Sequence, residues 1–213
     1  MKIVCFDFDG TLADSFKFLQ YSFDKVFYKH LGIHMTPQLF DKLSGPNEKG
    51  FLMKEFEDKY EDKYWEEYLS IYKEDANKMI TMFPGMKDML INLKNKGVHL
   101  VFLTGRSMET AMISLNDFGI ADVFEGYYAG SIEGCVKDKL LKDVANDFKI
   151  ETSDILYVGD SRQDIKDAKK AGSSIVSVLF SNPAWWEDIK KENPNYVFDT
   201  KELEKRILIF LSK

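Results

Sequence analysis

The sequence predicts an α/β fold, in which a Rossmann-like parallel sheet forms the core and an all-helical segment is inserted into it. Two observations carry this prediction. Apolar, strand-like runs alternate with amphipathic, helix-like segments over most of the chain, which is typical of parallel βαβ units. One long stretch, residues 16–82, reads as helical throughout and contains no convincing strand, so it stands apart from the alternating pattern.

The strand-like runs are short and nearly continuous in apolar residues, as expected for a sheet whose two faces are both covered. Each of the last three follows a helix-like segment, and two of these segments end at a glycine, where helices commonly terminate. The runs are 2–8, 98–104, 154–160 and 174–180, and the helix-like segments are 87–97, 137–149 and 162–172.

The inserted segment, 16–82, is rich in aromatic residues. It holds fourteen of the thirty aromatic residues of the chain, and many recur at helical spacing, so we expect it to have its own packed core. The chain is therefore predicted to divide into a discontinuous core domain, 1–15 and 83–213, and a helical domain, 16–82.

Composition limits the classes of function. A net charge of −6 argues against a broad nucleic-acid-binding surface. No apolar run is long enough to span a membrane, and the first apolar run breaks at Asp7, which is unlike a signal peptide. The two cysteines, Cys5 and Cys135, are expected to be reduced thiols in a cytoplasmic protein. The sequence does not indicate an oligomeric state.

The first strand-like run ends in two aspartates, within "VCFDFDGTLADS". If the strand continues through Phe8, the side chains of Asp7 and Asp9 point to the same side. Two nearby carboxylates repel each other, which indicates a bound cation or a catalytic task. The alternative is an Asp-Gly turn that closes a hairpin. Gly10 and Thr11 fit either case, since glycine permits a sharp turn and threonine can cap a helix.

Polar residues also stand at other predicted strand ends. Thr104 and Gly105 follow the second run, and Asp160 ends the third. Asp164 comes one helical turn later, and Lys137 opens a helix-like segment. Because ligands of open parallel sheets bind outside the carboxyl ends of the strands, we expect these residues to converge.

The chemistry of this set is that of phosphoryl transfer. Asp7, Asp9 and Asp160 offer hard oxygen ligands that suit Mg²⁺, and the cation would both relieve their repulsion and neutralise a phosphate. Thr104 can donate a hydrogen bond to a phosphoryl oxygen, and Lys137 can supply a point charge to the same group. One carboxylate is then free to act as nucleophile and another as acid and base.

These residues resemble the four motifs of the haloacid dehalogenase (HAD) superfamily. "DFDGT" at 7–11, Thr104, Lys137 and "GDSRQD" at 159–164 match the order and spacing of those motifs across essentially the whole chain. The insert directly after the first motif resembles the C1 helical cap of the phosphoglycolate phosphatase-like branch. The resemblance implies a HAD-like α/β core domain, a helical cap domain and a phosphatase activity.

The resemblance also implies a role for each motif residue. Asp7 is the nucleophile that forms an aspartyl-phosphate, and Asp9 protonates the leaving group and then activates the hydrolytic water. Mg²⁺ is held by Asp7, by the backbone carbonyl of Asp9 and by Asp160, while Asp164 supports the metal site from nearby. The implied phosphate-binding set comprises Gly10, Thr11, Thr104, Gly105 and Lys137.

Three assignments stay open. Lys139 competes with Lys137, because many relatives follow this lysine with proline and this chain has "VKDKLL"; we prefer Lys137 because it opens the helix. Arg106, in "TGR", is either a second phosphate or substrate contact or a surface ion-pair residue. "SGPN" at 44–47 is either a specificity loop or a plain turn.

The leading hypothesis is a Mg²⁺-dependent phosphatase that acts on a small phosphorylated metabolite, with the cap closing over the site to exclude water. Family dehalogenases typically lack an aspartate at the position of Asp9, so Asp9 favours phosphoryl transfer. The alternatives are a sugar phosphomutase on the same fold and a non-catalytic phosphoacceptor or binding module. The sequence does not name the substrate.

Overall fold

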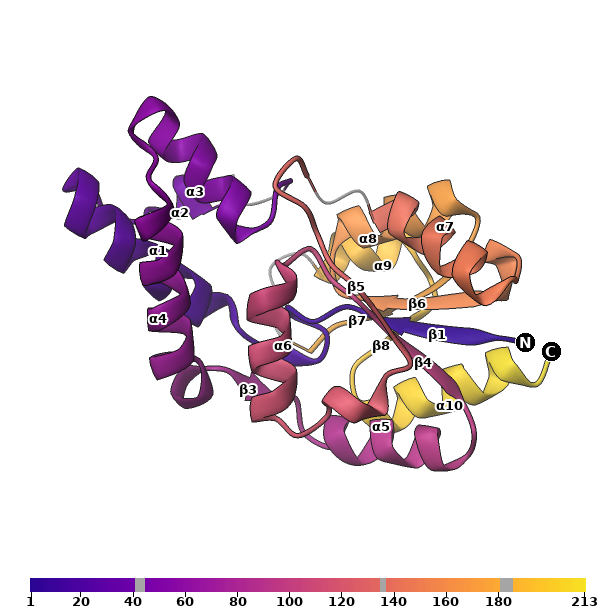
Figure 1. Cartoon of the computed structure of the whole chain (residues 1–213). Helices are drawn as coiled ribbons and strands as arrows, with labels where there is room; N and C mark the ends of the chain where they lie inside the picture. The colour runs from indigo at the N-terminus through magenta and orange to yellow at the C-terminus, as the bar shows by residue number, and fades with distance from the viewer. Residues whose placement is uncertain (41–44, 135–136, 181–185) are drawn as a thin grey trace.

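In the computed structural model, a six-stranded sheet lies between two layers of helices, and a further group of helices stands at one end of it (Figure 1). The structure describes residues 1–40, 45–134, 137–180 and 186–213. The strand order is β5-β4-β1-β6-β7-β8, and every neighbouring pair is parallel. The strands are β1 (Ile3–Phe6), β4 (His99–Leu103), β5 (Gly126–Tyr128), β6 (Ile155–Gly159), β7 (Ser174–Val178) and β8 (Tyr196–Val197). The predicted α/β class is confirmed.

The four strand-like runs of the sequence form the four central strands, β4, β1, β6 and β7. The two edge strands, β5 and β8, were not anticipated, because they have only three and two residues. Runs of that length carry too few positions for hydrophobic periodicity to identify them.

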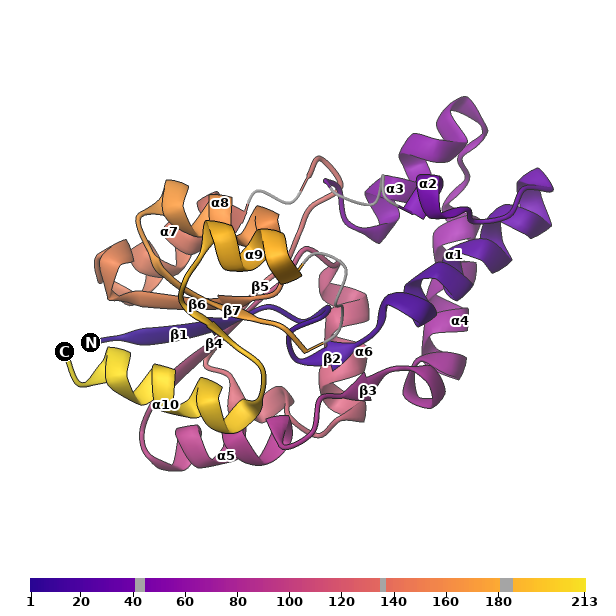
Figure 2. The same cartoon turned by 180° about the vertical axis from the view of Figure 1, so that it is seen from behind.

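Helices cover both faces of the sheet, as the continuous apolar strands require. One face packs against α7 (Lys137–Phe148), α8 (Arg162–Ala171) and α9 (Trp186–Glu192). The other packs against α5 (Met86–Asn95), α6 (Met108–Asp117) and α10 (Thr200–Leu211) (Figure 2). Short 3₁₀ turns, η3 (Ala121–Val123) and η4 (Thr152–Asp154), precede β5 and β6.

The inserted segment forms α1 (Phe16–Leu31), α2 (Pro37–Phe40), α3 (Glu48–Phe56), the 3₁₀ turn η2 (Glu57–Lys59) and α4 (Asp62–Met79). These helices lie beyond the carboxyl ends of the sheet strands (Figure 1). The expectation of a segment without any strand is wrong at its end, where β3 (Thr81–Met82) pairs antiparallel with β2 (Ala13–Asp14). The entry and exit chains of the segment are thus joined by backbone hydrogen bonds. The domain boundaries themselves stay a prediction.

The aromatic core of the inserted segment is continuous with the core of the sheet. Phe23, Phe27 and Phe51 are fully buried and in ring contact with one another. They belong to the same cluster of buried residues as Val4 of β1 and Leu93 of α5. The expectation of a separate core is therefore wrong, because α4 packs against α6 and carries the apolar contacts across.

Among the described residues, no helix has both the length and the apolar composition needed to cross a membrane. Cys5 lies in β1 as a buried free thiol, and its burial raises its pKa well above the ordinary value, which makes it unreactive. Cys135 and Ser44, which the sequence analysis also considered, lie outside the described residues.

Candidate active site

The register of the sheet brings three strand ends to one place. In β1, Phe6 lies beside Phe102 of β4 and Val158 of β6. The residues that follow these positions, Asp7 and Asp160 among them, therefore emerge together at the carboxyl edge. This edge faces the helices of the inserted segment (Figure 1). The convergence expected from the sequence is thus produced by strand pairing.

A turn, not the strand, carries the two aspartates of the first motif. β1 ends at Phe6, so the expectation that Asp7 and Asp9 share one side of a continuing strand is wrong. The N–H groups of Thr11, Leu12 and Ala13 all donate to the Phe8 carbonyl, at 2.9–3.2 Å, which folds the chain back sharply. The hairpin alternative is also wrong, because β2 pairs with β3 and not with β1.

Gly10 is required in this turn for two reasons. Its φ of +69° lies in the left-handed region that favours glycine. A Cβ atom at Gly10 would lie 2.1 Å from Oδ2 of Asp160, so no side chain fits. The amides of Gly10 and Thr11, expected to approach a phosphate, donate here to the carbonyls of Ala13 and Phe8. Thr11 is fully buried, and its hydroxyl has no hydrogen-bond partner among the described residues.

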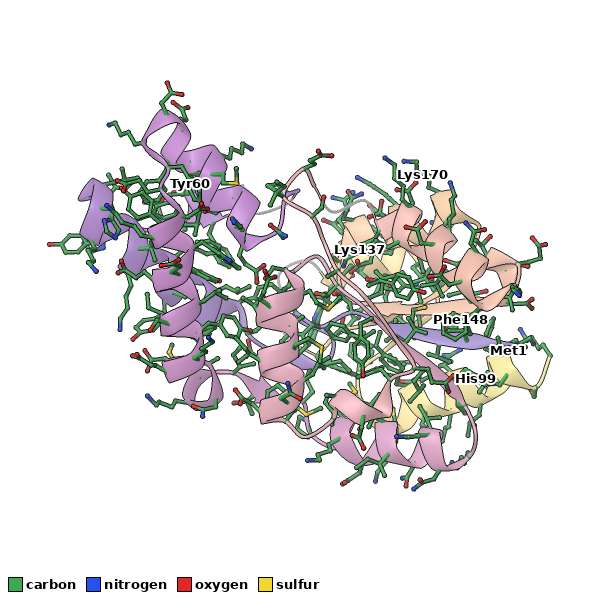
Figure 3. The ribbon with its side chains drawn as sticks, in the orientation of Figure 1. Met1, Tyr60, His99, Lys137, Phe148 and Lys170 are labelled. Atoms are coloured by element: carbon green, nitrogen blue, oxygen red, sulfur yellow. The ribbon has the colours of Figure 1, made fainter. Side chains whose placement is uncertain are left out.

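Lys137 stands at the start of α7 and joins two of the aspartates. Its Nζ donates to Oδ2 of Asp7 and to Oδ1 of Asp164, each at 2.6 Å. Its side chain is 12% exposed, whereas Lys139 is an exposed residue two positions further into the first turn. The structure therefore places Lys137, and not its competitor, at the carboxyl edge of the sheet (Figure 3).

Burial makes ionisation of two carboxyl groups costly. It raises the pKa of Asp7 to about 7, since it outweighs the opposing effect of Lys137, and the charges of Asp164 and Asp9 add to the rise. Burial also raises the pKa of Asp160 well above its usual range, reinforced by the charges of Asp164 and Asp7. Such crowding of carboxyl groups is stable only when a cation compensates it.

Asp164 is held in place by the helix that it begins. Its carboxylate accepts hydrogen bonds from the backbone N–H of Ser161 at 2.9 Å and from the Ser161 hydroxyl at 2.7 Å, which completes a capping box. The Tyr157 hydroxyl donates to the same carboxylate at 3.1 Å. Although burial alone would raise the pKa of Asp164, Lys137 and these hydrogen bonds hold it below the usual value.

The acidic residues fit a divalent cation. One carboxylate oxygen from each of Asp7, Asp160 and Asp164 lies within 4.8 Å of the others, and all three residues are buried. No described residue donates a hydrogen bond to Asp160, so its oxygens stay available as ligands. Buried carboxylate oxygens are hard donors of the kind that Mg²⁺ prefers.

Asp9 faces a different partner from Asp7. Its carboxylate accepts from Nε of Arg106 at 2.8 Å, from Nη2 of the same guanidinium and from the Ser15 hydroxyl. Burial would raise its pKa, yet Arg106 outweighs burial and holds the pKa of Asp9 below the usual value. The side chain of Arg106 is only 3% exposed. The alternative of a surface ion-pair residue is therefore wrong for Arg106.

Thr104 is one of the most deeply buried of the predicted site residues. It is fully buried, and its Oγ1 accepts from the backbone N–H of Arg106 at 3.3 Å. Its own N–H donates to the Tyr128 carbonyl at 2.9 Å. The next residues, Gly105 and Arg106, line the cavity. Thr104 thus shapes the turn that presents them, and its predicted contact with a phosphoryl group stays a prediction.

A cavity of about 400 Å³ opens above these residues. Its floor is polar and comes from the strand ends, with Asp7, Asp9 and Asp160 among the lining residues. Its roof is mainly apolar and comes from the inserted segment, whose lining residues are Phe16, Leu19, Phe23, Phe40, Gly45, Pro46, Asn47 and Glu48. Such a volume accommodates a small molecule and excludes a folded protein.

Sequence reasoning missed several residues of the site, two of which come from the inserted segment. Glu48, at the start of α3, is buried and lines the cavity. Its carboxylate accepts from the backbone N–H of Ser107 and from the Thr110 hydroxyl, both at 2.6 Å, and so joins the inserted segment to α6. Tyr72 of α4 receives a hydrogen bond from Nη1 of Arg106. The only available signal was Asn47, a good N-cap residue, in front of Glu48.

The loop containing "SGPN" also docks on the core. The side chain of Asn47 caps α3 by accepting from the Gly50 N–H at 3.0 Å, and it donates to the Gly130 carbonyl at 3.0 Å. The Asn47 N–H donates to the Ser131 carbonyl at 2.9 Å. Gly45, Pro46 and Asn47 all line the cavity, so the loop is more than a plain turn.

Comparisons with known proteins agree with this geometry. A model of the haloacid dehalogenase-like hydrolase family matches residues 4–178. The phosphoglycolate phosphatase of Nitrosococcus oceani is 25% identical over 210 residues, covering 93% of this chain and 92% of that protein. The phosphoglycolate phosphatase of Aquifex aeolicus is 28% identical over 184 residues, covering 84% of this chain and 85% of that protein.

Solved structures show the same fold. A predicted phosphatase from Clostridium acetobutylicum superposes with a TM-score of 0.77 at 24% identity, covering 98% of each chain. A predicted phosphoglycolate phosphatase from Haemophilus somnus superposes with a TM-score of 0.77 at 22% identity, again covering 98% of each chain. Together with the family match over most of the sequence, these likenesses show that the chain belongs to the haloacid dehalogenase-like hydrolase family and is a phosphatase.

Proposed function

We propose that this phosphatase hydrolyses the phosphate ester of a small metabolite in a Mg²⁺-dependent reaction that passes through an aspartyl-phosphate, a mixed anhydride formed on Asp7. The observation that supports this proposal is the position of Asp7 at the floor of the cavity, 2.6 Å from Lys137 and within reach of two further buried carboxylates. The curated relatives named phosphoglycolate phosphatase make phosphoglycolate the first substrate to test.

In the first half of the proposed reaction, a carboxylate oxygen of Asp7 attacks the phosphorus atom. The bond between phosphorus and the ester oxygen breaks, and the leaving alkoxide takes a proton from the carboxyl group of Asp9. Lys137 donates hydrogen bonds to Asp7 and Asp164 in this structure, so it is placed to neutralise a phosphoryl oxygen beside Asp7.

In the second half, Asp9 acts as a base. It removes a proton from a water molecule, which attacks the phosphorus atom of the Asp7 phosphate and releases inorganic phosphate and the free carboxylate. Arg106 favours the ionised form of Asp9, which suits this basic step and makes the protonated form that the first half requires less favourable. The apolar roof of the cavity limits the access of other water molecules.

Asp7, Asp160 and Asp164 would hold the Mg²⁺ ion, as the fit of their oxygens supports. When bound, the cation supplies positive charge that lowers the repulsion between the carboxylates and the phosphoryl group. The resemblance to the family assigned Asp164 a supporting place, and one of its oxygens lies within 4.8 Å of an oxygen of each of the other two residues.

The test is phosphate release from a panel of small phosphate esters, measured with Mg²⁺ and with EDTA. We expect turnover that requires Mg²⁺ and that falls by more than about a thousandfold in Asp7→Asn, which removes the attacking group. Asp58→Asn, at an exposed position of η2, makes the same chemical change away from the cavity and should leave turnover unchanged.

Two outcomes would contradict the proposal. Turnover that persists in EDTA would show that the reaction does not need Mg²⁺. Turnover that persists in Asp7→Asn would show that Asp7 is not the nucleophile. Isomerisation of a sugar phosphate without phosphate release would instead identify a phosphomutase.

A further inference from the structure

We infer that Arg106 is the residue that sets substrate selectivity, by binding a second anionic group of the substrate, a carboxylate close to the phosphate. The inference rests on the proposed function, because it concerns the other end of the molecule whose phosphate meets Asp7. In the proposed catalytic steps, Arg106 acts only through its contact with Asp9. Substrate binding is a second role for the same side chain.

Arg106 has unused donors and lies in the wall of the cavity. Among the described residues, its hydrogen bonds use Nε and one N–H of Nη2 on Asp9, and one N–H of Nη1 on Tyr72. The second N–H of each terminal nitrogen has no partner among the described residues, so two donors of the planar guanidinium are left for the two oxygens of a carboxylate. Arg106 lines the cavity although its side chain is only 3% exposed.

The guanidinium is held before any substrate arrives. Its central carbon lies 4.5 Å from the centre of the Phe8 ring and 5.5 Å from that of the Tyr72 ring. Tyr72 is itself fixed by a hydrogen bond of 2.6 Å to the Ser114 hydroxyl. A side chain held from three sides loses little conformational entropy when it binds a ligand. Arg106 is therefore a preorganised receptor.

The charge of the cavity points to the same residue. Among the described lining residues, only Lys137 and Arg106 are basic, whereas six are acidic. Lys137 contacts Asp7 and Asp164 and belongs to the phosphoryl end. An anionic group at the other end of a small substrate therefore has Arg106 as its cationic partner.

Glu48 is close enough to Arg106 for their charges to attract each other, but its carboxylate oxygens accept hydrogen bonds from other donors. It is the acidic residue that the inserted segment contributes to the cavity lining. However, one of its oxygens accepts from the Ser107 N–H and the other from the Thr110 hydroxyl, both at 2.6 Å. Both oxygens are thus directed to the start of α6. The rival interpretation is that the acidic lining selects a substrate with a cationic group. It predicts that an ester carrying an ammonium group is preferred over one carrying a carboxylate.

The experiment compares three esters of similar size, which differ in the charge of one group. They are 2-phosphoglycolate with a carboxylate, 2-hydroxyethyl phosphate with a neutral hydroxyl, and O-phosphoethanolamine with an ammonium group. The kcat/KM of each is measured for the wild type, Arg106→Gln, Arg106→Lys and Arg162→Gln. Arg162 pairs with Glu192 on the surface and is 51% exposed, so Arg162→Gln is the control for the change in net charge.

We expect the wild type to prefer 2-phosphoglycolate over the neutral ester. Arg106→Gln should lower that ratio of kcat/KM values by roughly 10- to 100-fold, the effect of losing one or two charge-assisted hydrogen bonds. The ratio for Arg106→Lys should lie between those of the wild type and Arg106→Gln, since lysine keeps the charge without the planar pair of donors. Arg162→Gln should retain the wild-type ratio. Circular dichroism of each variant checks that it is folded.

A binding measurement separates this inference from the proposed function. The Kd values of phosphonoacetate and ethylphosphonate, which cannot be hydrolysed as esters, are compared by titration calorimetry in Mg²⁺. A loss of the preference for phosphonoacetate in Arg106→Gln supports the inference even if no ester is turned over. An unchanged preference in Arg106→Gln, or a wild type that prefers the neutral or the ammonium ester, overturns it while leaving the phosphatase proposal intact.

Discussion

At the scale of single residues, the site pairs each aspartate of the first motif with its own cation. Asp7 contacts Lys137, and Asp9 contacts Arg106. The two carboxylates therefore differ in environment although they are two positions apart. Burial raises the pKa of Asp7 to about 7, whereas Arg106 holds the pKa of Asp9 below its usual range. The two carboxyl groups thus differ in proton affinity, and the proposed nucleophilic role of Asp7 requires a nearby cation that favours its ionised form.

The raised pKa of Asp7 predicts a pH-dependent effect on stability in EDTA. The folded pKa of about 7 exceeds the ordinary value of 3.8, so the folded state binds more protons between these values and loses stability as the pH rises through that window. Asp7→Asn has no ionisable group at this position, so it does not lose stability in this way. We expect the Tm of Asp7→Asn, relative to the wild type, to increase between about pH 4 and pH 7.5.

Differential scanning calorimetry at several pH values checks this prediction, with the exposed Asp58→Asn as the control. The control should keep a nearly constant Tm difference across the range. A difference for Asp7→Asn that is flat, or that shrinks as the pH rises, would show that burial of Asp7 does not dominate its ionisation.

At the scale of elements, helix starts hold the site together. α8 begins with a capping box in which Ser161 and Asp164 bind each other's backbone N–H groups. α7 begins at Lys137, and α3 begins beside the cavity with Asn47 as its cap. Helix starts offer unpaired N–H groups that must be satisfied, so side chains there are fixed in orientation. The same caps therefore orient the site residues.

The capping box of α8 should matter for both stability and metal binding. Ser161→Ala is expected to cost about 1 kcal/mol in the free energy of unfolding and to weaken Mg²⁺ binding, because Asp164 loses the hydroxyl that orients it. Asp199→Ala removes the cap of α10, which accepts from the Glu202 N–H at 2.8 Å, and should cost a similar amount without any effect on Mg²⁺ binding.

Urea unfolding and Mg²⁺ titration of both variants measure the two effects. Equal Mg²⁺ affinities in Ser161→Ala and Asp199→Ala would mean that the capping box is structural and does not orient the metal site.

At the scale of the whole molecule, the inserted segment and the sheet share one apolar core. The buried residues run from Phe27 and Phe56 in the segment to Leu203 and Ile207 in α10. Glu48 and Asn47 add hydrogen bonds across the cavity to α6 and to the loop at 130–131. A core that continues across both parts couples their unfolding, since neither part can lose its packing alone.

A single cooperative transition is therefore expected on heating. Phe27→Ala in α1 and Ile207→Ala in α10 should each lower the Tm of that one transition, at a cost of about 3–5 and 2–5 kcal/mol. Both side chains are fully buried and neither lines the cavity. Calorimetry that resolves two peaks, with Phe27→Ala moving only one of them, would contradict the shared core.

The sequence by itself determined the class of the fold, the four central strands and the residues of the motifs. Continuous apolar runs and helical periodicity are local properties, so 2–8 and 154–160 could be recognised as strands. The carboxyl ends of parallel strands always share one edge, which is why Asp7, Asp160 and Lys137 could be expected to meet.

Tertiary structure alone decided which charges pair and where the core lies. No spacing indicates that Arg106 lies against Asp9, or that Glu48 reaches across to Ser107, because such contacts join residues 97 and 59 positions apart. The turn at Gly10 depends on the nearby Asp160 side chain, and the shared core depends on α4 packing against α6. Contacts of this kind arise from three-dimensional packing and leave no periodic signal in the chain.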